Sequence, residues 1–202
     1  DRSYARDAEY AHRFLASFQQ HNADGLPLYV VIPDADEPLF SDFRQAGATI
    51  VPESALGRYL VDYPVHGNNP GYVNHQIIRL SFWELGLTAN TLNLDSELVF
   101  VRNFFASDFM YSEDVPYTFL SEDHELRVEP EYWNEIWNRR KVQLDAIKDA
   151  IGLTDPRYLT IHGMGVYSST VLRSWKEKFL QPRSLSYVDA LQISPIPPTW
   201  YS

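Results

Sequence analysis

Two carboxylates follow an apolar segment in the middle of the chain. A strand is predicted over 91–94, and Asp95, Ser96 and Glu97 come directly after it. Residues two apart on an extended chain point to the same side, so we expect the carboxylates of Asp95 and Glu97 to face one side. Mg²⁺ and Mn²⁺ prefer oxygen ligands, commonly carboxylates together with water and substrate phosphates. The pattern fits a divalent cation that holds a diphosphate, and an exposed acidic turn between two strands, a common feature, is the alternative that spacing alone favours.

A second acidic pair, Asp34 and Asp36, has the same spacing and also follows an apolar strand, predicted over 28–32. Pro33 and Pro38 flank this pair. Acidic stretches with neighbouring prolines favour turns over ligand sets. Spacing alone leaves both pairs open as cation sites.

Polar side chains on a predicted helix could hold the same ligand. This helix begins at Pro70 and is ended by Gly86. Gln76 and Arg79 are three residues apart and therefore share a helix face. The guanidinium fork of arginine suits phosphate oxygens, and a glutamine amide can bond a hydroxyl or a carbonyl. An ion pair between Arg79 and an acidic neighbour such as Asp95 is the alternative interpretation.

His162 lies between a predicted strand and the glycine-containing turn 163–165. It is a candidate metal ligand or acceptor contact, and a structural hydrogen-bonding histidine is the alternative. The polar run 168–170 is interpreted as a helix cap, because no histidine lies at a recognisable triad spacing. The chain has no cysteine, which excludes thiolate metal sites and cysteine nucleophiles. No P-loop or Gly-x-Gly-x-x-Gly fingerprint occurs, which disfavours a Walker-type NTPase and a Rossmann dehydrogenase.

The overall composition is that of a packed globular protein with an acidic surface. Of 202 residues, 45% are hydrophobic and 14% are aromatic. The chain has 17 Lys and Arg and 27 Asp and Glu, which gives a formal net charge of −10. This charge disfavours nucleic acid and anionic membranes as partners. Apolar runs stay far below the roughly 20 residues of a membrane span, so we expect no transmembrane segment.

Helices and strands alternate along the chain, which predicts one α/β domain over residues 1–202 with a mostly parallel central sheet flanked by helices. Residues 57–71, rich in glycine and proline, are expected to form a long loop. Helices are predicted over 4–20, 41–45, 70–85, 131–151 and 168–179, and strands over 28–32, 48–51, 91–94, 98–101 and 158–161.

The helix 71–80 and the segment 92–104 together resemble bacterial glycosyltransferases of the GT-A fold, in particular a group found with surface-polysaccharide genes. Members of that group have a helix with Gly-aromatic, Gln and Lys/Arg-Leu, then a strand end with Asp-Ser-Asp that closes on Phe. Residues 28–34 resemble their strand with Pro-Asp, and 198–202 the start of their C-terminal acceptor-side motif. The resemblance implies a GT-A-like (Rossmann-like) fold and transfer of a sugar from a nucleotide-diphosphate donor to an acceptor hydroxyl.

In that fold the acid-any-acid motif holds a divalent metal against the donor diphosphate. The resemblance therefore implies Mn²⁺ or Mg²⁺ at Asp95 and Glu97, with Gln76, Arg79 and Ser96 also at the nucleotide sugar. It further implies a carbohydrate acceptor, and polysaccharide synthesis in the cytoplasm or at the inner face of the membrane. A sugar nucleotidyltransferase and a non-catalytic carbohydrate-binding domain are the alternative functions.

Two departures from the family pattern matter. Glu97 is one methylene longer than the usual aspartate, which allows it to bridge to the metal through water in place of direct coordination. The chain opens with a helix and stops near the acceptor-side motif, so we expect a core that lacks its first strand and last catalytic segment. Asp34 and Asp36 match no metal position of the family. No residue is assigned as the catalytic base.

Overall fold

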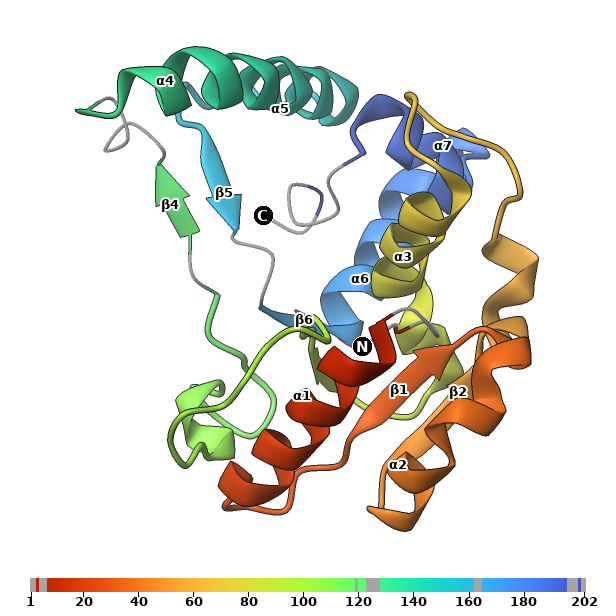
Figure 1. Ribbon diagram of the computed structural model, residues 1–202. Coiled ribbons are helices and arrows are strands. Elements are labelled where there is room, and N and C mark those ends of the chain that lie inside the picture. Colours follow the sequence, from red (N-terminus) through yellow and green to blue (C-terminus); the bar gives the residue numbers. More distant parts are fainter. Residues whose placement is uncertain are drawn as a thin grey trace. The chain divides into compact units, whose positions relative to one another are not determined.

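A computed structural model describes residue 3 and residues 7–118, 120–122, 128–161, 165–195 and 200. The fold is mixed α/β (Figure 1). Its helices are α1 (Ala8–His21), α2 (Ser41–Gln45), α3 (Pro70–Ser81), α4 (Pro130–Tyr132), α5 (Asn138–Ile151), α6 (Ser169–Trp175) and α7 (Tyr187–Ile193). Its strands are β1 (Tyr29–Ile32), β2 (Thr49–Pro52), β3 (Asn90–Leu92), β4 (Leu120–Glu122), β5 (Leu159–Ile161) and β6 (Val166–Ser168).

The strands pair two by two. β1 and β2 are parallel, in a register that sets Tyr29 opposite Thr49. β4 and β5 are antiparallel, and β3 pairs with β6. The strand predicted over 98–101 is not formed. Within the described residues, the large and mostly parallel central sheet that the sequence predicts is therefore not shown; the strands, three or four residues long, form separate pairs.

The chain divides into two compact units. The first unit combines Asp1–Arg58 with Leu92–Tyr117, and the second combines Tyr59–Thr91 with Thr118–Ser202. Each unit has buried hydrophobic clusters of its own. Asp95 and Glu97 belong to the first unit, and α3 to the second.

In the first unit, α1 contributes to two apolar clusters through residues at helical spacing. Ala11 and Leu15 pack with β1 and α2. Phe14 and Phe18 pack with Phe104 in a second, largely aromatic cluster. Side chains three and four residues apart share a helix face, so one helix serves both clusters. Figure 1 shows the parallel strands β1 and β2 side by side in orange.

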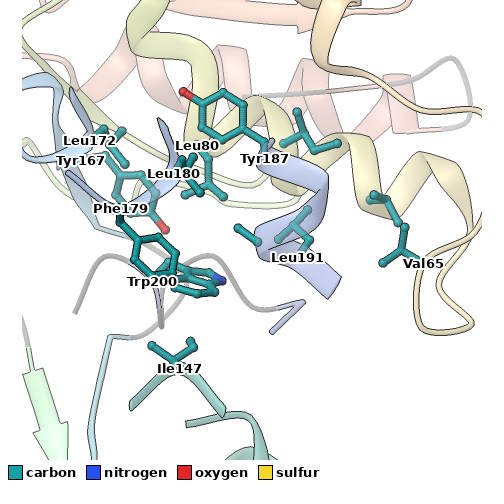
Figure 2. Close-up of a cluster of buried hydrophobic side chains, with 13 residues drawn as sticks. Val65, Leu80, Ile147, Tyr167, Leu172, Phe179, Leu180, Tyr187, Leu191 and Trp200 are labelled. Atoms are coloured by element: carbon teal, nitrogen blue, oxygen red, sulfur yellow. The ribbon is translucent and has the colours of Figure 1, made fainter. Parts of the chain in front are cut away.

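In the second unit, α3 begins and ends where local sequence signals predict. The Asn69 side chain accepts a hydrogen bond from the Tyr72 backbone N–H at 2.9 Å, and Pro70 is the first helical residue. A 3₁₀ turn, Phe82–Leu85, extends the helix to Gly86, which has a φ of 67°. The apolar face of α3 contributes to a buried cluster with α6, α7 and Trp200 (Figure 2). This cluster holds Val65, Val73, Ile77, Leu80, Ile147, Tyr167, Leu172, Phe179, Leu180, Tyr187, Ala190, Leu191 and Trp200.

The two remaining long helices follow the prediction with local differences. α4 and α5 are joined by a π-helical turn, Trp133–Trp137, so the helical stretch is continuous until Gly152. Ser168 occupies the N-cap position of α6, as predicted, but its side chain makes no capping hydrogen bond. α7 was not predicted, although Ser186 and Asp189 form a capping box at its start.

Among the described residues, no helix has the length and apolar character needed to cross a membrane.

Candidate functional site

Asp95, Ser96 and Glu97 form a tight turn in the first unit. The Leu98 backbone N–H donates to the Asp95 carbonyl at 3.1 Å, which closes the turn. Ser96 is buried, Asp95 is half-buried and Glu97 is exposed. The backbone is thus the acidic turn that the sequence left open as an alternative. The prediction that Asp95 and Glu97 point to one side assumed an extended chain. Because the chain turns here, that reason does not apply.

Apolar residues on both sides of the turn attach it to the first unit. Leu94 and Leu98 pack against the aromatic cluster that includes Phe14 and Phe18. Beyond the turn, the Phe100 backbone N–H donates to the Ser17 hydroxyl of α1 at 3.1 Å. The side chain of Phe100 stacks on Phe104 with ring centroids 4.0 Å apart. These contacts fix both ends of the turn, so a ligand at its acidic residues would meet a positioned backbone.

The other acidic pair is used differently. Asp34 follows β1, and its carboxylate accepts hydrogen bonds from the Ser54 backbone N–H at 3.0 Å and from the Ser54 hydroxyl at 2.5 Å. The bonds from the Ser54 side chain and backbone lower the pKa of Asp34. Ser54 follows β2, so Asp34 links the ends of the two parallel strands. Asp34 begins a 3₁₀ helix, Asp34–Phe40, which stands where the sequence predicted a turn, and its bonds to Ser54 give Asp34 a structural role.

On α3, Gln76 is buried and Arg79 is half-buried. Burial raises the pKa of Tyr72, and the positive charge of Arg79 opposes that shift. Tyr72 and Arg79 are seven residues, or two turns, apart, so they lie on the same side of the helix. Gln76 and Arg79 belong to the second unit, and the Asp95 turn belongs to the first.

The chemistry of the donor set at the turn suits a hard cation. Carboxylate oxygens are ligands that Mg²⁺ and Mn²⁺ accept, and Mg²⁺ commonly keeps several waters or phosphate oxygens besides one or two carboxylates. Among the described residues, no group of three or more His, Asp or Glu side chains could hold a metal. A cation at Asp95 and Glu97 would therefore take its other ligands from water and substrate. His162, predicted as a metal ligand, lies outside the described residues.

A buried polar cluster in the second unit was not predicted. Glu84, in the turn after α3, accepts hydrogen bonds from Lys176 at 2.7 Å, from the Tyr187 hydroxyl at 2.5 Å and from the Tyr59 hydroxyl. Only 10% of the Glu84 side chain and 23% of the Lys176 side chain are exposed. The ammonium of Lys176 also lies 5.9 Å from the centre of the Trp83 ring. These residues, called here the Glu84 cluster, join α3 to the helical segment 169–180 and to α7.

Electrostatics in the Glu84 cluster favours the charged pair. Burial by itself raises the pKa of Glu84, but the hydrogen bonds from Lys176, Tyr187 and Tyr59 outweigh it and leave that pKa lowered. Burial likewise acts to lower the pKa of Lys176, and Glu84 reverses this so that the pKa is raised. Burial and then Glu84 raise the pKa of Tyr187, which keeps its hydroxyl a donor. Both oxygens of Glu84 are thus committed to bonds within the fold.

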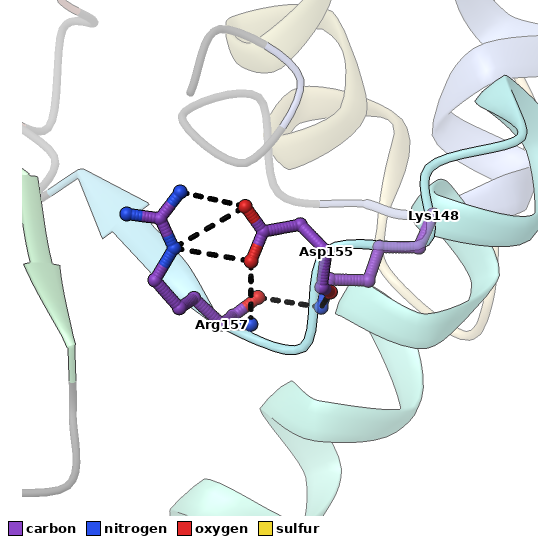
Figure 3. Close-up of polar contacts among 3 residues, drawn as sticks. All are labelled: Lys148, Asp155 and Arg157. Carbon is purple, nitrogen blue, oxygen red and sulfur yellow. Dashed lines mark hydrogen bonds and ion pairs between the residues drawn. The ribbon is translucent and has the colours of Figure 1, made fainter.

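The loop after α5 is closed by a second set of polar contacts (Figure 3). Arg157 donates to both carboxylate oxygens of Asp155, with the shortest distance 2.6 Å from its Nη2. Lys148 donates to the backbone carbonyls of Asp155 at 2.7 Å and Arg157 at 2.5 Å. The Lys148 ammonium also lies 3.8 Å from the centre of the Tyr158 ring. These bonds pair the Asp155 carboxylate within the loop and assign it a structural role.

Comparison of the chain with protein-family models, with curated proteins and with solved structures found no significant match in any of the three.

Proposed function

We propose that the chain is a metal-dependent glycosyltransferase with a GT-A-like fold, which moves a sugar from a nucleotide-diphosphate donor to an acceptor hydroxyl. The observation that carries the proposal is the Asp95–Ser96–Glu97 turn, which combines an exposed carboxylate with a backbone attached on both sides to buried residues. Its order along the chain, after a helix that carries Gln76 and Arg79, is the order of the family that the sequence resembles.

Each candidate residue has a distinct part in this function. Asp95 and Glu97 would hold Mn²⁺ or Mg²⁺, Glu97 through its exposed carboxylate or a bridging water. The ion supplies positive charge where negative charge develops on the departing diphosphate. Arg79 and Gln76 would bond phosphate and hydroxyl groups of the donor, as their donor and acceptor atoms allow. Ser96 is buried, and its backbone would contribute to the shape of the turn.

Binding of nucleotide diphosphates tests the proposal. We expect calorimetric titration of UDP and GDP to show binding of at least one of them that requires Mn²⁺. Asp95→Ala should weaken this binding by more than tenfold, because one carboxylate ligand is lost. Asp36→Ala is the matched control, an acid with the same spacing in the same unit, and should leave binding unchanged.

Binding that is independent of Mn²⁺, or equal in Asp95→Ala and the original chain, would overturn the metal site. Loss of binding in Asp36→Ala with retention in Asp95→Ala would move the cation to the other acidic pair. Metal-dependent binding of a nucleotide diphosphate without sugar transfer would instead support the non-catalytic alternative.

A further inference from the structure

A short hairpin in the first unit carries two exposed tyrosines that the proposed metal site does not use. The Tyr117 backbone N–H donates to the Phe109 carbonyl at 2.9 Å, and the Tyr111 N–H donates to the Val115 carbonyl at 2.8 Å. Met110 and Pro116 form an antiparallel bridge between these two pairs. This backbone pairing gives residues 109–117 a defined register.

The register puts four side chains on one face of the hairpin. Residues two apart on a strand, and residues directly opposite each other, share a face, so Phe109, Tyr111, Val115 and Tyr117 do so. Phe109 packs at the base against Phe104, with ring centroids 6.2 Å apart. The other three are 73%, 51% and 41% exposed, in the order Tyr111, Val115 and Tyr117. The face is therefore anchored at one end and open to solvent at the other.

The two tyrosine rings form an angled, supported surface. Their centroids lie 6.0 Å apart with an interplanar angle of 78°, an edge-to-face contact. Such a contact between aromatic rings is favourable and restricts both side chains before any ligand arrives. A preordered surface loses less side-chain entropy on binding than a mobile one.

Acidic residues at the tip define which ligand this surface suits. Glu113 and Asp114 lie in the loop between Tyr111 and Val115, and both are exposed. Within the part of the chain that the structure describes, neither side chain makes a hydrogen bond or an ion pair. Carboxylates accept hydrogen bonds from hydroxyl groups, whereas they repel phosphate and sulfate groups. Aromatic rings provide the apolar body and polar edge that a sugar ring, with its C–H face and equatorial hydroxyls, can contact.

We propose that this hairpin face, Tyr111, Val115 and Tyr117 with Glu113 and Asp114 beside them, is a binding subsite for a neutral oligosaccharide. A sugar ring lies on the exposed face of Tyr111, and its hydroxyls donate to the carboxylates at the tip. Under the proposed transferase function this ligand is the acceptor, and in that sense the inference rests on that function. The subsite itself needs neither metal nor nucleotide, so its test is independent of the donor site.

The test measures binding of glycans to the full chain without metal and without nucleotide. The probes are immobilised neutral hexasaccharides of β-1,4-glucan, α-1,4-glucan and β-1,4-mannan, with a sulfated heparin hexasaccharide as the anionic probe. We expect one neutral probe to bind and the sulfated one not to bind. Tyr111→Ala and Tyr117→Ala should each weaken binding by up to roughly tenfold, the size of one aromatic contact.

Three further variants separate stacking from folding. Tyr111→Phe keeps the ring and should retain most of the affinity, whereas Glu113→Gln should weaken binding less than Tyr111→Ala does. Tyr10→Ala is the matched control, because Tyr10 is 53% exposed on α1 in the same unit. It should bind as the original chain does.

Absence of binding to every neutral probe would overturn the proposal, and so would equal affinity of Tyr111→Ala, Tyr117→Ala and Tyr10→Ala. Binding only to the sulfated probe would show that basic residues elsewhere attract anions. If nucleotide diphosphates bind with Mn²⁺ while no glycan binds, the subsite fails and the donor site stands. If a neutral glycan binds while no nucleotide diphosphate binds with Mn²⁺, the donor site fails and the subsite stands.

Discussion

The Asp95 turn of the first unit and the Glu84 cluster of the second both contain acidic residues beside aromatic rings, yet their surroundings differ. In the turn, Glu97 is exposed, and the neighbouring leucines together with backbone hydrogen bonds hold the chain in place. In the cluster, Glu84 is largely buried and both carboxylate oxygens accept hydrogen bonds from the fold. A carboxylate whose acceptor sites are occupied by the protein has little capacity left for a ligand.

The difference separates structural acids from acids that are candidates for binding. Burying a charge is costly unless it is paired, so the partners of Glu84 are needed for stability. An exposed carboxylate such as Glu97 keeps its water and can exchange it for a cation. Asp34, bonded twice to Ser54, falls on the structural side of this comparison.

The largest expected effect is on stability, in the Glu84 cluster. Glu84→Ala leaves the ammonium of Lys176 partly buried without its counter-ion, and we expect the free energy of unfolding to fall by about 3 kcal/mol. Urea unfolding followed by circular dichroism measures it. A fall smaller than about 1 kcal/mol is typical of a surface ion pair. It would contradict the distinction between the structural acid Glu84 and the exposed acid of the turn. Lys141→Ala, at a more exposed ion pair with Asp145, is the control and should cost less.

Removal of Leu98 addresses the attachment of the turn. Leu98 packs partly buried on the aromatic cluster, so Leu98→Ala should cost about 1–2 kcal/mol, less than a fully buried leucine. It should also weaken Mn²⁺-dependent nucleotide binding, because the turn is held less firmly. Leu39→Ala serves as the control, since Leu39 is 51% exposed in the same unit. If Leu98→Ala reduces stability but leaves nucleotide binding unchanged, the packing of Leu98 does not position the proposed metal site.

A cap substitution tests α3 independently of the Glu84 cluster. Asn69→Ala removes the bond from the Tyr72 N–H, and a lost cap costs about 1 kcal/mol. Thermal or urea unfolding measures the change. Asn134→Ala, an exposed asparagine in a helix, should leave stability unchanged or slightly raised. Equal effects of the two substitutions would contradict the capping role.

The smallest expected effect is a change in how stability depends on pH. The folded-state pKa of Glu84 is lowered, so its contribution is present above the ordinary glutamate pKa and is lost as pH falls through the folded value. Between about pH 6 and pH 3 the original chain should therefore lose more stability than Glu84→Gln does. Urea midpoints at several pH values compare the two. Parallel curves would show that the charge of Glu84 is not stabilised by the fold.

Local signals in the sequence predicted α3 well and the sheets poorly. Asn69, Pro70 and Gly86 are all within or beside the helix, so its start and end could be inferred from residues near each other. Whether residues 95–97 form a strand end or a turn depends on how Leu94 and Leu98 pack against α1, about 80 positions earlier in the chain, and spacing does not carry that information.

The Glu84 cluster was missed for the same reason. Glu84 and Lys176 are 92 positions apart, so no local pattern in the sequence brings them together. α7 differs, because Ser186 and Asp189 are a capping pair at helical spacing that the sequence does contain. Its seven residues are too few for a clear helical period, so that signal was not recognised.

The central claim is that a divalent cation binds at Asp95 and Glu97, and the broadening of amide signals by Mn²⁺ tests it directly. In ¹H–¹⁵N spectra of the labelled chain with UDP or GDP present, we predict that small additions of Mn²⁺ broaden the amide signals of Asp95, Ser96 and Glu97 first. Asp95→Ala should remove this selectivity. Broadening centred on Asp34 and Asp36, or spread evenly over the acidic surface, would contradict the account.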